Sequence, residues 1–263
     1  MTINAQWSLT PAISRDRQRT AQPLPVAVLK PCVGWSARSA LLGRNRSRTD
    51  PTAGRFTRRD VRRVLAAAWA TFDRRSARLP HESTLGSRQN VQLACLTLSM
   101  LEALTAAGIQ REYAIELIGD ACWKVYAQWG QIPRAVSRMV TRDPARRMRI
   151  GVEMFLHYPF NRPGYRYKDV PEPRGRGLDM LRCPVADYLI SEAAADLCVA
   201  TWCNLDFPLA HMWGGELERH GTLAAGEPRC DFRFRASGPD SARDRQGARR
   251  VRRQRPSGSA IAR

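Results

Sequence analysis

Three cysteines in the C-terminal half of the chain are the strongest candidates for chemistry. Cys183, Cys203 and Cys230 each have an acidic residue within four positions and lie at the edge of an apolar run. A thiolate is a nucleophile and a metal ligand, and a nearby carboxylate can act as its base or as a second ligand. Because buried polar groups are costly without partners, we expect residues 182–235 to hold a functional site.

Cys183 is predicted to be a reactive thiolate. It directly precedes Pro184, and proline is favoured at the first position of a helix. The positive end of a helix dipole lowers the pKa of a thiol placed there. Arg182 acts in the same direction, whereas Asp187, one turn further on, opposes it. The alternative is a capping cysteine without activity.

Cys203 and Asp206 lie three positions apart, so they share one face of the helix expected at residues 199–207. They can serve as nucleophile and base, or as two metal ligands. The pair is expected near the C-terminal end of that helix, where the dipole disfavours a thiolate. A reactive Cys203 therefore needs a positive partner, and Arg219 or Arg233 can supply it.

The segment from Cys230 to Arg235 alternates between apolar and charged residues, which predicts a strand. Cys230 is either a buried structural thiol or, because a turn precedes the strand, a residue at the mouth of a pocket. Asp231 points to the opposite face. Arg219, Arg233 and Arg235 are expected near the thiols, where arginine can bind a carboxylate through two hydrogen bonds. A basic, solvated face is the alternative.

The histidines give little support for a metal centre. His211 and His220 are the two histidines of this stretch. A zinc site made of Cys203, Asp206, Cys230 and a histidine is chemically possible. No Cys-x-x-Cys or His-x-x-x-His pairing accompanies it, however. We expect no metal and no cofactor.

The same stretch resembles the L-2-amino-thiazoline-4-carboxylic acid hydrolase family. That family has an Arg-Cys-x-x-Ala-(Glu/Asp) block, then Cys-x-x-Asp-Phe, and a closing segment that ends in Cys-Asp-Phe-Arg-Phe-Arg. The corresponding residues are Arg182, Cys183, Ala186 and Asp187; Cys203, Asp206 and Phe207; and Leu217, Arg219, Thr222, Gly226 and Cys230–Arg235. His220 departs from the family, which usually has Thr there. The resemblance covers residues 86–235.

The resemblance implies hydrolytic opening of 2-amino-thiazoline-4-carboxylate to N-carbamoyl-cysteine. Both covalent attack by a thiolate and direct attack by water, activated by Asp206 or Asp231, fit this reaction. A related hydrolase or lyase acting on another cyclic or thiol-bearing metabolite, and a non-enzymatic thiol- or metal-sensing protein, are the alternatives. The residues expected to act are Cys203, Asp206, Cys230 and Cys183 in catalysis, and Arg219, Arg233 and Asp231 in substrate binding.

Apolar periodicity predicts the elements that position these residues. Cys95, Cys122 and Cys198 fall within or between apolar runs and are interpreted as packing residues. The fold expected is α+β, with a helical N-terminal half packed on a small antiparallel sheet with additional helices. We expect helices from residue 57 to Pro80 and at 87–107, 112–129, 132–139, 184–197 and 199–207, and strands at 164–170, 177–182, 216–219, 222–224 and 230–235.

The net charge of +19 is concentrated at the two ends of the chain. Residues 1–55 are expected to form a disordered basic extension, residues 56–235 one α+β domain, and residues 236–263 a disordered basic tail. The basic tail lacks aromatic residues for base stacking, so we expect no specific nucleic-acid binding. No apolar run is long enough for a membrane span. A small-molecule substrate, a cytoplasmic location with free thiols, and possible homo-oligomers are expected.

Overall fold

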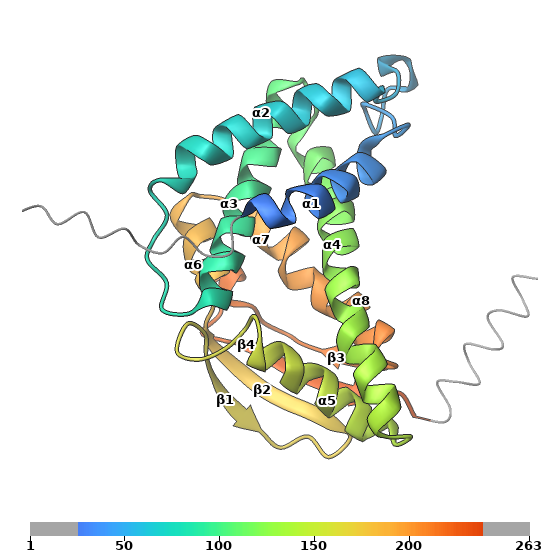
Figure 1. The fold of residues 1–263 in the computed structure, drawn as a ribbon, viewed down its shortest axis with the longest axis vertical. Helices are drawn as coiled ribbons and strands as arrows, with labels where there is room; N and C mark the ends of the chain where they lie inside the picture. Colours follow the sequence, from blue (N-terminus) through green and yellow to red (C-terminus); the bar gives the residue numbers. More distant parts are fainter. Residues whose placement is uncertain (1–25, 239–263) are drawn as a thin grey trace, which may run out of the picture.

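The computed structural model describes residues 26–238 and has an α+β fold (Figure 1), which confirms the predicted fold class. Helices α1–α4 build one end of the molecule and the sheet lies at the other, while the long helix α4 runs along both (Figure 1). The larger helices are α1 Val26–Leu41, α2 Arg58–Ser76, α3 Leu85–Ala106, α4 Arg111–Val140 and α5 Pro144–His157. The short ones are α6 Pro184–Ser191, α7 Ala195–Thr201 and α8 Asp206–Met212.

Local capping fixes where two of the central helices begin. Thr57 and Asp60 form a capping box at the start of α2. Thr84 and Ser87 form a second box at the start of α3. Helix α3 is buried on nearly all sides because α2, α4 and α6 pack around it. It is therefore the centre of the helical half.

Helix α4 is one continuous helix, so the prediction of two separate helices at 112–129 and 132–139 is wrong. Pro133 lies inside α4, where it removes one backbone donor and normally bends or breaks a helix. The C-terminal region packs against α4 at this point, where Trp213 donates its indole N–H to the carbonyl of Gly130 at 3.0 Å. Helix α5, which begins at the capping residue Asp143, was not predicted at all.

The sheet has four antiparallel strands in the order β1-β2-β4-β3. Its strands are β1 Arg166–Val170, β2 Gly175–Arg182, β3 Gly215–Glu218 and β4 Cys230–Ala236, close to the predicted ranges. Helix α5 packs on β2 and β4. The predicted strand at 222–224 is wrong, because these residues are part of a short 3-10 helix, Leu223–Ala225. The side chain of Thr222 caps the start of this helix by accepting a hydrogen bond from the Ala224 N–H.

The predicted helices at 184–197 and 199–207 are shorter and broken differently. Helix α6 ends before Ala193, which has a left-handed backbone conformation (φ 53°), and α7 ends at Thr201. A 3-10 helix, Cys203–Leu205, then leads directly into α8. Asp206 therefore begins a helix, and the prediction that the Cys203–Asp206 pair lies at a helix C-terminus is wrong.

Part of the N-terminal extension that was predicted to be disordered is folded. Helix α1 packs against α4, and Leu41 at its end is 1% exposed. Arg44 and Arg48, which follow it, form ion pairs with acids of α4. Pro31 inside α1 hides this helix in the sequence, because proline normally bends or breaks a helix. Ala236, assigned to the C-terminal tail, is buried in β4. The remaining predicted disorder lies in residues 1–25 and 239–263, outside the described residues.

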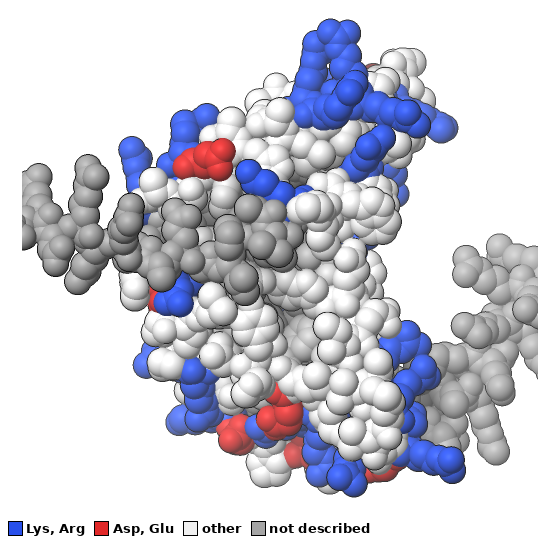
Figure 2. Space-filling view, in the orientation of Figure 1, with Lys and Arg blue, Asp and Glu red and all other residues white. Residues whose placement is uncertain are grey.

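Charged side chains are unevenly placed on the face shown in Figure 2. Lys and Arg gather over its two ends, whereas the part of its middle that remains visible carries few charged groups. Within residues 26–238, no helix is both long enough and apolar enough to cross a membrane.

Candidate active site

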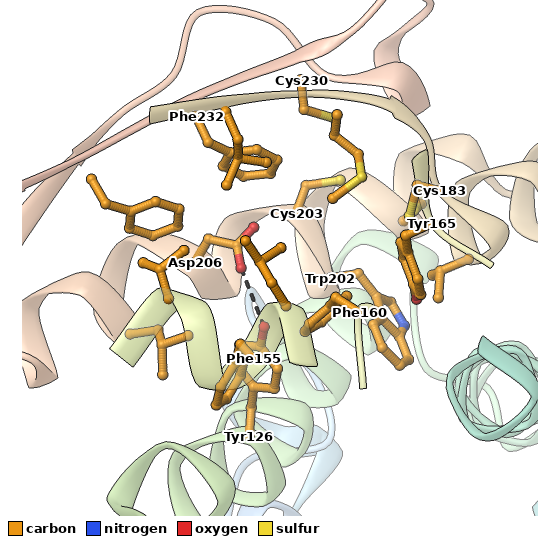
Figure 3. Close-up of a pocket in the computed structure, with 18 of the residues that line it drawn as sticks. Tyr126, Phe155, Phe160, Tyr165, Cys183, Trp202, Cys203, Asp206, Cys230 and Phe232 are labelled. Atoms are coloured by element: carbon orange, nitrogen blue, oxygen red, sulfur yellow. Dashed lines mark hydrogen bonds between the residues drawn. The ribbon is translucent and has the colours of Figure 1, made fainter. Parts of the chain in front are cut away.

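One cavity brings the predicted thiols and the predicted carboxyl together. It encloses about 100 Å³ between the sheet, α4, α5 and the short helices α6–α8, and Cys183, Cys203, Asp206 and Cys230 all line it (Figure 3). The other lining residues are almost all aromatic or aliphatic, among them Tyr126, Phe155, Phe160, Tyr165, Trp202, Phe232 and Phe234. With about 10–15 Å³ needed per water, the space suits several waters or one small ligand.

The four polar residues come from three parts of the chain. Strand β4 begins at Cys230, which lies opposite Met180 of β2 in the antiparallel register. Strand β2 ends two residues further on, so Cys183 follows it and caps α6. Cys203 and Asp206 enter from the 3-10 helix and the start of α8. The fold, more than any single motif, therefore creates the cavity.

Cys203 is the one cavity thiol whose pKa is lowered. The main cause is a hydrogen bond from the thiol of Cys198, which favours the Cys203 thiolate and raises the pKa of Cys198 itself. Burial opposes this effect, while the hydroxyl of Thr222, 3.4 Å from the sulfur, and the charge of Arg219 add to it. Cys203 is thus the cavity thiol that ionises most readily.

The pKa of the Asp206 carboxyl is shifted in the opposite direction, upward. Burial raises the pKa of its carboxyl from 3.8 to about 7, although Arg219 lies 3.6 Å away and favours the charged form. The negative charge of the Cys203 thiolate raises it further, and Tyr126 donates a hydrogen bond to the carboxyl at 3.3 Å. A carboxyl of this kind can give and take a proton near neutral pH.

The prediction that Cys183 has a lowered pKa is wrong. Burial raises the pKa of its thiol far above the ordinary value and outweighs the backbone N–H groups at the start of α6. Arg182 is turned toward acids instead, with an ion pair to Glu82 at 2.8 Å. Burial also raises the pKa of Cys230 to about 11, and its sulfur accepts a hydrogen bond from the Leu223 N–H. Both thiols stay protonated in the cavity wall.

Arg219 is the positive partner that Cys203 requires, and Arg233 is not. Arg219 donates to the Cys203 carbonyl at 2.7 Å, and its guanidinium lies over the ring of Phe207. Arg233 instead pairs with Asp179 of β2 at 2.9 Å. Neither arginine is among the residues that line the cavity.

Asp231, predicted to bind substrate, does not line the cavity either. Its carboxylate accepts hydrogen bonds from the backbone N–H groups of His220 and Gly221 and so holds the loop before η3, the 3-10 helix at Leu223–Ala225. Burial works against ionisation, but these hydrogen bonds prevail and hold the pKa of Asp231 at about 2. Asp231 therefore has a structural role in this loop.

The sequence interpretation missed two contributors to the site. Tyr126 was assigned to the apolar face of a helix and Cys198 to packing, yet both touch the titrating groups. Tyr126 and Cys198 follow the same helical spacing as core residues, so no sequence signal separates them from the core. Among the described residues, no group of three or more His, Cys, Asp or Glu is placed to hold a metal ion.

The family model for L-2-amino-thiazoline-4-carboxylic acid hydrolase matches residues 89–234. The chain belongs to this family. The matched region contains every residue that lines the cavity and leaves α1 and α2 outside. No curated protein and no solved structure matches the chain. The resemblance inferred from Cys203–Arg235 is thereby confirmed for this hydrolase family.

Proposed function

We propose that the protein is a hydrolase that opens the ring of a small cyclic amidine of the 2-amino-thiazoline type, with Cys203 as nucleophile and Asp206 as general acid and base. One observation carries the proposal: a thiol of lowered pKa lies beside a carboxyl of raised pKa in a single apolar cavity. Opposite shifts in neighbouring groups favour an acid–base pair tuned for catalysis. Family membership supports the same reaction class.

The first step breaks the ring. The Cys203 thiolate attacks C2 of the amidine, the C2–S bond breaks, and the ring sulfur leaves with the proton of the Asp206 carboxyl. The enzyme then carries an isothiourea on Cys203, and the opened substrate carries a free thiol. A thiol whose pKa lies near the ambient pH is a good nucleophile at neutral pH, because a large fraction of it is thiolate.

The second step releases the product. The Asp206 carboxylate takes a proton from water, the hydroxide adds to the isothiourea carbon, and Cys203 leaves as a thiolate. The product is a urea, so the sum of both steps is substrate plus one water. Thr222, Cys198 and Arg219 support the proposal because each favours the Cys203 thiolate at the start and at the end.

The test is turnover of 2-amino-thiazoline compounds, with and without the 4-carboxylate, followed by mass spectrometry of the urea and by titration of the released thiol. Cys203→Ser should lose turnover by roughly 10³-fold or more while melting nearly as wild type, because a nucleophile acts mainly in the transition state. Cys32→Ser is the matched control, since Cys32 lies on α1 and does not line the cavity. An unchanged rate in Cys203→Ser would refute covalent catalysis at this residue.

A further inference from the structure

A second cavity lies in the helical half of the protein. It has a volume of about 80 Å³ and lies between α1, α2, α3, α4 and the segment from Trp202 to Leu205. None of the described residues that line it is Lys, Arg, His, Asp or Glu, and most of them are aliphatic or aromatic. Apolar cavities of roughly 150 Å³ stay dry and take up benzene or xenon. The second cavity therefore suits an uncharged molecule of at most one small ring, because burying an unpaired charge is strongly unfavourable.

The wall that α1 and α2 contribute is particular to this chain. Both helices lie outside residues 89–234, which the family model matches. They supply Val33, Ala37, Leu65, Ala68 and Trp69 to the wall. Val33, Leu65 and Trp69 are half-buried, so a ligand can reach the space from the side of these two helices. The part of the chain that carries the family pattern therefore does not enclose this space by itself.

The few polar groups in the wall are neutral. Thr97 donates its hydroxyl to a backbone carbonyl one turn earlier at 2.8 Å, and Asn90 donates its amide to the Tyr165 hydroxyl at 2.8 Å. Burial raises the pKa of the Cys122 thiol to about 11, so this thiol stays protonated. The indole N–H of Trp202 is buried and has no hydrogen-bond acceptor among the described residues, which is costly. Trp202 can therefore donate to a ligand.

Two side chains connect the second cavity to the first. Tyr126 and Trp202 line both, so they form the wall between the two spaces. Tyr126 donates its hydrogen bond to Asp206 in the first cavity (Figure 3), and Trp202 directly precedes Cys203. A side chain beside an empty space lacks attractive contacts on that side, and a ligand restores them. A ligand in the second cavity can therefore act on the acid–base pair without touching it.

We propose that the second cavity is a binding site for a small uncharged apolar molecule of at most one ring, and that its occupant acts on the first cavity through Tyr126. This site is distinct from the one that holds the substrate. Binding at this site is independent of the proposed reaction, whereas the effect on turnover rests on it.

Thermal unfolding of the full-length protein with benzene, and with xenon as the smaller probe, tests the binding site. A probe at about tenfold excess over its Kd should raise Tm by about 3–6 °C. Ala68→Leu should abolish this rise, because Ala68 is 1% exposed and the larger side chain fills the cavity. Ala67→Leu, on the exposed side of the same helix, is the matched control and should keep the rise. No rise with either probe in the wild type would overturn the proposal, and this measurement needs no variant.

The first cavity is apolar as well, so a variant that fills it distinguishes the two sites. Val152 lines the first cavity and not the second. Val152→Leu should keep the rise in Tm that Ala68→Leu loses. The opposite result, with the rise kept in Ala68→Leu and lost in Val152→Leu, would locate the probe in the first cavity and overturn the assignment.

Turnover of 2-amino-thiazoline-4-carboxylate in the presence of saturating benzene tests the action through Tyr126. In the wild type, kcat/KM should change by about fivefold or more. The response should be absent in Ala68→Leu, which cannot bind the probe, and in Tyr126→Phe, which lacks the hydroxyl that reaches Asp206. No response in the wild type, or an equal response in Tyr126→Phe, would overturn this action. If no thiazoline is turned over, the proposed reaction is refuted, and the Tm measurements still decide whether the binding site exists.

Discussion

Replacing Asp206 with asparagine should make the stability of the protein depend less on pH. Burial raises the pKa of this carboxyl from 3.8 to about 7 in the folded protein. A raised pKa means that the folded state binds the proton more tightly than the unfolded state. The resulting stabilisation is fully present below a pH of about 3.8 and is lost as the pH rises through about 7. Asparagine cannot titrate, so the variant lacks this loss.

The size of the effect follows from the two pKa values. At about 1.36 kcal/mol per pKa unit, the full difference is roughly 4 kcal/mol, and the part that falls between about pH 5 and pH 8 is roughly 2–3 kcal/mol. The Asp206 side chain is 18% exposed, so solvent screens the effect only weakly. As the pH rises from about 5 to about 8, the free energy of unfolding of the wild type should therefore fall by roughly 2–3 kcal/mol relative to that of Asp206→Asn.

Urea denaturation of both proteins at several pH values measures this difference, because titrating groups that do not interact with Asp206 contribute equally in both proteins. Asp231→Asn is the matched control. The pKa of Asp231 is lowered to about 2, so its stabilising effect is lost only as the pH falls through about 2 and is constant between about pH 5 and pH 8. A constant difference between wild type and Asp206→Asn across the same range would refute the buried, proton-binding carboxyl.

Three further outcomes are expected. Iodoacetamide should alkylate Cys203 at lower pH than Cys183, as peptide mass spectrometry can show, because the pKa of the first thiol is lowered and that of the second is raised; the reverse order would contradict the assigned nucleophile. Leu41→Ala should lower the free energy of unfolding by roughly 2–5 kcal/mol, because Leu41 is 1% exposed, whereas Leu42→Ala, at 39% exposure, should change it little; equal effects in urea denaturation would contradict the packing of α1. Tyr126→Phe removes a hydrogen bond that lowers the pKa of the Asp206 carboxyl, the proposed general acid and base, so the pH optimum of turnover should move upward; a pH–rate profile that moves downward would contradict this contact.

Local sequence determined much of the fold. Thr57 and Asp60 define the start of α2 through a capping box that depends only on residues three apart. The alternation from Cys230 to Arg235 defines β4 because side chains of a strand point to opposite faces. The spacing of Cys203 and Asp206, together with the family pattern, also identified the two residues that the proposed mechanism uses. These features involve neighbours along the chain.

Other properties were decided by contacts between distant segments. The helix start at Pro184 predicts a reactive Cys183, yet burial among residues from three parts of the chain raises the pKa of its thiol, since desolvation outweighs the helix dipole. Arg219 and Arg233 are equivalent in sequence, and only the folding of the 203–222 segment brings Arg219 against the site. Tertiary structure therefore decided which thiol ionises and which cation supports it, because both depend on the surroundings that the folded chain creates.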